Sequence, residues 1–207
     1  MEQGFLTEKK KISSIKHYET DTLKDLYMYN MGNVILQVTQ NCNLRCEYCV
    51  YSGSYINRVH TNKRMSFETA VKTIDFLAAH SLNCNEVSIG FYGGEPLLEI
   101  ELIKKAVSYA KEVFGEKKVN FNMTTNATLL NMDIADFLVQ NDFNITISLD
   151  GPRNIHNKNR IFANSNKGTF DLIMENIALI REKYPFFDKK ISFNAVIDLK
   201  QNVSLSL

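Results

Sequence analysis

Strand-like and helix-like segments alternate along most of this 207-residue sequence. Amphipathic stretches with apolar residues at helical spacing lie between short stretches rich in β-branched and aromatic residues. The five strand-like stretches are residues 33–39, 86–92, 119–125, 144–149 and 191–197. Alternation of this kind predicts an α/β fold, in which crossover helices connect the strands of a parallel sheet. The periodicity leaves two architectures open, an open doubly wound sheet and a curved partial barrel.

Capping residues mark the boundaries of three of the helical stretches. Ser66 and Asn131 precede apolar residues at helical spacing and are expected N-caps. Gly115 follows residues 102–114 and is expected to end that helix, because glycine is common just past a helix C-terminus. A further helix is expected over residues 169–183.

Chemically distinctive residues directly follow each of the first four strand-like stretches. They are Cys42, Cys46 and Cys49, then Gly93, Gly94, Glu95 and Pro96, then Asn126, then Asp150 and Gly151. The carboxyl ends of parallel strands meet at one edge of a sheet, and α/β folds bind their ligands at that edge. We therefore expect these residues to lie close together in a single site.

Charge and hydropathy argue against several classes of protein. The formal net charge is +1, so no strong field indicates nucleic acid or a membrane as the main partner. No apolar run is long enough to span a bilayer, and the N-terminus lacks the apolar segment of a signal peptide. We expect a cytoplasmic protein in which residues 1–30 form a tail or one short element and residues 31–207 form one domain.

Three of the four cysteines form the pattern Cys42-x3-Cys46-x2-Cys49. Clustered thiols in a reducing compartment more often bind metal or take part in redox chemistry than form disulfides. A structural zinc site normally takes four protein ligands, whereas a 4Fe–4S cluster held by three cysteines keeps one iron open for a small molecule. His60 could complete a zinc site, which stays the alternative. Cys84 stands alone and is expected to be a small, partly buried apolar residue.

The cysteine spacing, with the aromatic Tyr48 before the last cysteine, resembles the signature of the radical S-adenosylmethionine (SAM) superfamily. The resemblance extends over residues 33–198 and includes other segments. They are Gly93-Gly94-Glu95-Pro96, Thr124-Thr125-Asn126, Ser148-Leu149-Asp150-Gly151-Pro152, His156 and Arg160. The later segments resemble the branch of peptide- and protein-modifying enzymes with a cysteine-rich C-terminal domain, the SPASM type. The sequence after the cysteines most resembles maturases of cysteine-rich ribosomal peptides, in residues 51–55, Arg58, His60, Lys63, Arg64 and Met65.

This resemblance implies a partial (β/α)6 TIM-like barrel that is incomplete at its C-terminus. The implied ligands of a 4Fe–4S cluster are Cys42, Cys46 and Cys49, and the open iron would take the amino nitrogen and carboxylate of SAM. The expected SAM-binding residues are Tyr48, Gly93, Gly94, Glu95, Asn126, Ser148 and Arg160.

The amino acid head of SAM accounts for four of these assignments. Gly93 and Gly94 lack side chains, so their backbone could approach SAM closely, although a plain tight turn would also explain them. Glu95 would place a carboxylate beside the ammonium group of SAM. Arg160 would pair with the SAM carboxylate, unless it is an ordinary surface arginine.

The remaining polar and aromatic candidates also have two interpretations each. Asn126 and Ser148 would bind ribose or carboxylate oxygens, unless they only cap turns. Tyr48 and Phe91 would pack near the adenine, or else belong to the core. No catalytic residue is assigned, and Asp150 could simply hold the turn after its strand.

The resemblance implies an enzyme that cleaves SAM reductively to a 5′-deoxyadenosyl radical and forms Cys thioethers in a ribosomally made peptide. Its expected partners are a peptide or protein substrate and a reductant such as flavodoxin or ferredoxin. One alternative is an anaerobic sulfatase-maturing enzyme that makes formylglycine, and another is a non-catalytic remnant or zinc-binding domain. Because the sequence stops at Leu207 without a sixth strand or later cysteines, we expect a fragment, a truncated gene product or a short relative.

Overall fold

A computed structural model describes residues 14–52 and 59–197 of the chain. Some residues considered in the sequence lie outside the described part. They are the three consecutive lysines at residues 9–11, and residues 53–55 and Arg58 of the segment that resembles peptide maturases. Within the described part, five parallel strands form one sheet in the order β1-β2-β3-β4-β5. Their bounds are Asn33–Thr39, Glu86–Gly93, Lys118–Thr125, Asn144–Ser148 and Ile191–Asn194.

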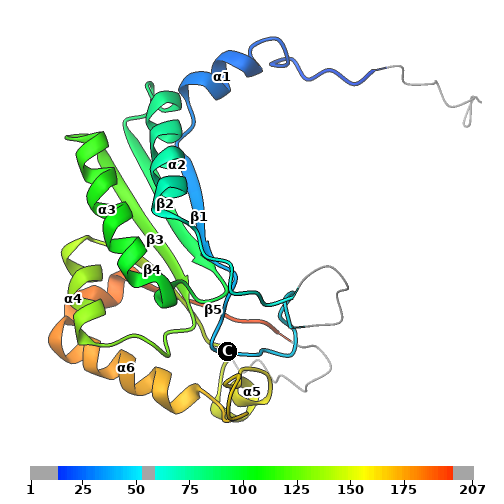
Figure 1. Ribbon diagram of the computed structural model, residues 1–207, viewed down its shortest axis with the longest axis vertical. Helices are drawn as coiled ribbons and strands as arrows, with labels where there is room; N and C mark the ends of the chain where they lie inside the picture. The colour runs from blue at the N-terminus through cyan, green and yellow to red at the C-terminus, as the bar shows by residue number, and fades with distance from the viewer. Residues whose placement is uncertain (1–13, 53–58, 198–207) are drawn as a thin grey trace, which may run out of the picture.

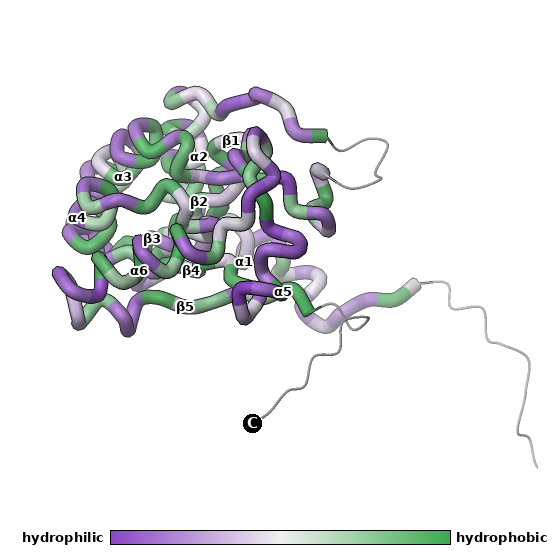
Figure 2. Tube along the Cα trace, turned by 90° about the horizontal axis from the view of Figure 1, so that it is seen from below, coloured by the Kyte–Doolittle hydropathy of each residue, from purple (hydrophilic) through white to green (hydrophobic). Residues whose placement is uncertain are grey.

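The order of the strands decides between the two predicted architectures. A doubly wound sheet reverses its strand order at a switch point, whereas these strands follow one another in chain order without a reversal. The result is an open parallel sheet that corresponds to part of a TIM-like barrel, as the family resemblance implies. In the view of Figure 2 the strands succeed one another from β1 to β5, and the crossover helices lie on one side of them.

Six α-helices accompany the described sheet (Figure 1). They are α1 Leu23–Tyr29, α2 Phe67–His80, α3 Ile100–Phe114, α4 Met132–Gln140, α5 Arg153–Asn159 and α6 Phe170–Lys183. Two 3₁₀ helices, η1 Pro96–Glu99 and η2 Pro185–Lys190, also occur. Among the described helices, none is long and apolar enough to cross a membrane.

The predicted helix caps are confirmed in the structure. The side chain of Ser66 accepts a hydrogen bond from the backbone N–H of Thr69, and that of Asn131 accepts one from Ile134. Gly115 ends α3 with a φ of 56°, a left-handed conformation that glycine adopts without a steric penalty. Local capping therefore fixes where three crossover helices begin or end.

The core lies between the sheet and the helices α2, α3, α4 and α6. Phe91, Phe121 and Phe143 stack within it, with ring centroids 5.4–6.4 Å apart. Phe91 is only 1% exposed, so it belongs to the core and not to a cofactor site. Cys84 packs at the edge of this core as a half-buried residue, as expected from the sequence.

Four predicted strands differ from the structure at one end, because β2 and β3 are each one residue longer than expected and β4 and β5 are shorter. The last strand ends at Asn194 rather than at residue 197, and β4 ends at Ser148. Helix α5 was not predicted, because its sequence RNIHNKN carries no apolar stripe. Its buried residues are His156 and Asn159, so polar contacts rather than an apolar face hold this helix in place.

Candidate functional site

A cavity of about 360 Å³ opens at the carboxyl ends of the strands. Its walls contain the three expected cluster ligands and, with the exception of Glu95, the expected SAM-binding residues. These residues are Cys42, Cys46, Tyr48, Cys49, Gly93, Gly94, Asn126, Ser148 and Arg160. The structure therefore brings these nine residues together at one edge of the sheet, whereas Glu95, Pro96, Asp150 and Gly151 do not line the cavity. The cavity also includes Leu44, Tyr51, His60, Tyr92, Thr124 and Asn194.

The cysteine loop, residues 40–52, is held on one side by the turn after β2. The N–H of Gly94 donates to the carbonyl of Thr39 at 3.0 Å, and the N–H of Glu95 donates to that of Asn41 at 2.9 Å. A Cβ on Gly93 would lie 2.2 Å from the Thr39 oxygen, and one on Gly94 would lie 2.2 Å from the Asn41 oxygen. Both positions require glycine because this turn packs against the cysteine loop, a reason that the sequence did not reveal.

The chain after α5 holds the other side of the cysteine loop. Three backbone hydrogen bonds join the two segments, at 2.9 to 3.2 Å. They run from Arg45 to Ile161, from Glu47 to Asn159 and from Ala163 to Asn43. The loop that carries Cys42 and Cys46 is therefore paired with protein backbone on both sides.

The environment of the thiols fits an iron–sulfur cluster. Burial raises the pKa of Cys42 to about 12 and that of Cys46 to about 11, so their thiolates need a cationic partner. The N–H of Leu44 and the amide of Asn126 point at the Cys42 sulfur, at 3.4 and 3.8 Å, and would stabilise a thiolate there. In a cluster each thiolate binds a different iron, so three thiols that line the same cavity suit it.

A mononuclear zinc site matches the geometry less well. In the described part of the chain, no three His, Cys, Asp or Glu side chains converge to hold a single metal ion. His60, the suggested fourth zinc ligand, lies in the cavity wall with Nε2 2.7 Å from the hydroxyl of Ser52.

Glu95 is not among the residues that line the cavity, and its carboxylate faces donors within the protein. The side chain is buried and accepts three hydrogen bonds, from the N–H of Leu97 at 3.0 Å, the hydroxyl of Thr125 at 2.6 Å and the N–H of Asn126 at 2.7 Å. Burial raises the pKa of Glu95, while these three donors oppose the rise. Glu95 links the start of η1 to the end of β3. In this way it holds Thr125 and Asn126, which line the cavity.

Asn126 and Ser148 occupy the cavity wall as predicted, but the Asn126 side chain has partners within the protein. Its oxygen accepts from the N–H and hydroxyl of Thr128, at 3.0 and 2.7 Å, and its nitrogen donates to the Asn43 oxygen at 2.9 Å. The turn-capping interpretation of Asn126 therefore holds. Ser148 lies at the last position of β4, opposite Asn194 of β5.

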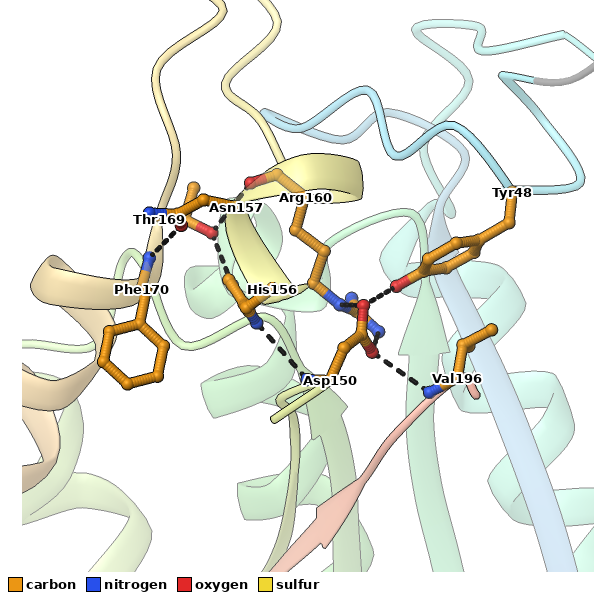
Figure 3. A network of polar contacts seen from close by, with 8 residues as sticks. All are labelled: Tyr48, Asp150, His156, Asn157, Arg160, Thr169, Phe170 and Val196. Carbon is orange, nitrogen blue, oxygen red and sulfur yellow. Dashed lines mark hydrogen bonds and ion pairs between the residues drawn. The ribbon is translucent and has the colours of Figure 1, made fainter. Parts of the chain in front are cut away.

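Asp150 joins the cysteine loop to the end of α5 (Figure 3). Its carboxylate accepts hydrogen bonds from the hydroxyl of Tyr48, from Nε and Nη2 of Arg160 at 2.9 and 3.1 Å, and from the N–H of Val196 at 3.0 Å. The Arg160 guanidinium also lies over the Tyr48 ring, 5.4 Å from its centroid. Asp150 thus holds its turn, as the sequence allowed, and in addition pairs with the arginine predicted to bind SAM.

His156 links the Asp150 backbone to Thr169 through its two ring nitrogens. Its Nδ1 accepts from the N–H of Asp150 at 3.3 Å, and its Nε2 lies 2.9 Å from the hydroxyl of Thr169. That hydroxyl also donates to the carbonyl of Arg160 at 3.2 Å. Burial, together with the nearby Arg160 charge, lowers the pKa of His156 to about 4, so the imidazole is neutral at neutral pH.

Comparison with known proteins gives the same family as the motifs. A family model described as Radical SAM superfamily matches residues 36–202. An uncharacterised protein of Methanocaldococcus jannaschii is 38% identical over 157 residues, which are 75% of this chain and 51% of the relative. A cysteine-type anaerobic sulfatase-maturating enzyme of Clostridium novyi is 33% identical over 180 residues, 86% of this chain and 46% of that enzyme. The chain spans about half the length of the curated relatives it matches.

A solved structure described as native anSMEcpe with bound AdoMet superimposes with a TM-score of 0.66 at 29% identity. The match covers 79% of this chain and 43% of that one. The same protein with bound AdoMet and the Cp18Cys peptide gives a TM-score of 0.64 at 28% identity, covering 79% of this chain and 42% of that one.

Proposed function

The chain belongs to the radical SAM superfamily, and from this premise we propose that it binds a 4Fe–4S cluster through Cys42, Cys46 and Cys49 and cleaves SAM reductively. One observation is the main support for this proposal. The three thiols line the same cavity as Gly93, Gly94, Ser148 and Arg160, at the carboxyl ends of β1, β2, β3 and β4. A cluster in one wall would therefore face a pocket that offers backbone, hydroxyl and guanidinium groups to a small charged ligand.

The roles of the chain's own residues follow from this arrangement. A cluster held by Cys42, Cys46 and Cys49 would supply the electron for reductive cleavage of SAM, and the radical chemistry would belong to these cofactors. Arg160 binds the carboxylate of SAM, and Ser148 contributes a hydroxyl group at the end of β4. The Gly93–Gly94 backbone forms the wall next to the cysteine loop, and Tyr48 lies against Arg160. Glu95 acts indirectly, because its hydrogen bonds within the protein fix the turn that Gly93 and Gly94 begin.

We propose a peptide or protein as the substrate, with Cys thioether formation in a ribosomally made peptide as the reaction. The electron would come from a small reductant such as flavodoxin or ferredoxin. The motif after β4 and the segment after the cysteines support this reading through their resemblance to peptide maturases. Formylglycine formation is the second candidate, because a relative at 33% identity is named as a sulfatase-maturating enzyme and the superimposed structure contains a peptide.

The first test concerns the cluster and uses anaerobic reconstitution of the chain with iron and sulfide. We expect a brown protein that converts SAM to 5′-deoxyadenosine when dithionite is added. Cys46→Ala should hold much less iron and sulfide than the unchanged chain. Cys84→Ala removes a half-buried cysteine outside the cavity and serves as the matched control, with iron content unchanged. A colourless protein that holds stoichiometric zinc would refute the proposal.

The second test separates the two substrate reactions. The reconstituted chain would be incubated with cysteine-containing peptides, both the precursor-type peptides encoded near its gene and sulfatase-type peptides. Thioether formation removes two hydrogens from the peptide. Formylglycine formation oxidises the cysteine Cβ by two electrons, and water then replaces the sulfur, which leaves as hydrogen sulfide, so that Cβ becomes the aldehyde carbon. Mass spectrometry distinguishes the two products, and SAM cleavage without either product would contradict both substrate proposals.

A further inference from the structure

Asp150 is the acceptor on which three separate segments of the chain meet. Tyr48 comes from the cysteine loop, Arg160 from the end of α5, and Val196 from the chain after β5. The Asp150 side chain is only 1% exposed, and that of Arg160 is 10% exposed. A buried carboxylate with four donors holds its partners in defined positions, because each alternative position would leave a buried charge unpaired.

The geometry of the Asp150–Arg160 pair leaves one edge of the guanidinium available. Asp150 takes the side edge, formed by Nε and Nη2. A guanidinium has five N–H groups in a fixed plane, so a second edge, formed by Nη1 and Nη2, presents another pair of parallel donors. Within the described residues no partner is found for that second edge, and Arg160 is part of the cavity wall. A second carboxylate can therefore bind Arg160 in a bidentate manner while Asp150 stays in place.

Both groups of the pair are ionised. Burial alone would raise the pKa of Asp150, but the hydrogen bonds from Arg160, Tyr48 and Val196 outweigh it and lower the pKa. Burial alone would lower the pKa of Arg160, but the hydrogen bond to Asp150 reverses this and raises it.

We propose that Asp150 is a positioning residue, which fixes the Arg160 guanidinium so that its Nη1–Nη2 edge faces the carboxylate of bound SAM. The inference rests on the proposed function, since it needs SAM in this cavity. The Tyr48 hydroxyl and ring restrain the same pair from the cysteine loop, so the orientation of Arg160 depends on the loop that carries the proposed cluster ligands. Asp150 itself touches neither the substrate nor SAM in this proposal.

The test compares Asp150→Asn with a matched control in the reconstituted chain. Asp136 also accepts hydrogen bonds from a cation and a tyrosine, Lys183 and Tyr184, but lies on α4 away from the cavity. We expect Asp150→Asn to retain its iron and sulfide and to bind SAM about 10- to 100-fold more weakly, by analogy with the loss of a residue that orients a metal ligand. Asp136→Asn should bind SAM as the unchanged chain does. Equilibrium binding and the change in the electron paramagnetic resonance spectrum on adding SAM give two readouts besides activity.

A double-mutant cycle shows whether Asp150 acts through Arg160. In the background of Arg160→Gln, the change Asp150→Asn should weaken SAM binding no further, because the group it positions is gone. Two results would overturn the inference: unchanged SAM affinity in Asp150→Asn, or equal and additive losses in both backgrounds. Loss of iron in Asp150→Asn would overturn it as well, since the residue would then serve the cluster loop. If the unchanged chain holds no cluster or binds no SAM, the proposed function itself fails.

Discussion

Gly94→Ala tests whether the glycine turn exists to hold the cysteine loop. The new Cβ would lie 2.2 Å from the carbonyl oxygen of Asn41 and 3.1 Å from the Cβ of Cys42, so the loop must retreat by about 1 Å to restore ordinary contact. That movement breaks the 2.9 Å hydrogen bond from Glu95 to Asn41 and strains the 3.0 Å bond from Gly94 to Thr39. At about 1–3 kcal/mol for each buried group left unpaired, we expect a loss of about 2–5 kcal/mol in the free energy of unfolding.

The assay is thermal unfolding followed by circular dichroism, together with the iron content after reconstitution. For a chain of this size the loss corresponds to a fall in Tm of about 4–20 °C. Iron content should fall as well, because the displaced loop carries Cys42. Gly90→Ala in β2 is the control, because the new Cβ would lie 3.3 Å from the Ile35 side chain and 3.8 Å from the Val34 carbonyl oxygen, and its Tm should change little. A Gly94→Ala protein with unchanged Tm and full iron content would refute the reasoning.

Two further predictions concern buried titratable groups. The pKa of His156 is about 4 in the folded chain against 6.5 in the unfolded chain, so the unfolded state binds more protons between these values and stability falls as the pH drops through this window. The free energy of unfolding should decrease by about 2 kcal/mol between pH 7 and pH 5, and urea titrations of His156→Asn should show a smaller decrease. Glu95→Gln turns one acceptor oxygen into a donor facing N–H and O–H groups, and we expect a loss of about 2–4 kcal/mol by urea unfolding. Glu86→Gln, at an exposed pair with Lys118, is the control and should change stability by less than about 0.5 kcal/mol; an equal loss in both would contradict the role of Glu95.

Much of the fold could be predicted from local sequence. Strand and helix periodicity placed the strands and crossover helices, and Ser66, Asn131 and Gly115 fixed their ends, because caps depend on only a few neighbouring residues. The convergence of the site residues followed from topology alone, since parallel strands end at the same edge. The strand order, which decided for a partial barrel, needed the structure.

The contacts within the site could not be predicted in the same way. Glu95 follows a glycine pair and looks like a ligand-binding acid, but its three donors come partly from β3, some thirty residues later. The link between Asp150 and Arg160 depends on α5, a polar helix without a periodic signal. One signal was present: Pro152 precedes His156 and Arg160, whose spacing of four residues puts both on one face of a helix.

The backbone pairing of the cysteine loop with residues 159–163 has a consequence for the order of events during synthesis. Arg45 finds its partner Ile161 only after roughly 115 more residues have left the ribosome, which takes on the order of 10 s at ordinary translation rates. Until then the loop carrying Cys42 and Cys46 has its earlier partners, among them the glycine turn, Lys63 and Thr128, but lacks the backbone of residues 159–163. The thiols therefore emerge early and acquire their complete surroundings late. Any machinery that delivers iron and sulfide meets a finished binding loop only after most of the domain has been made.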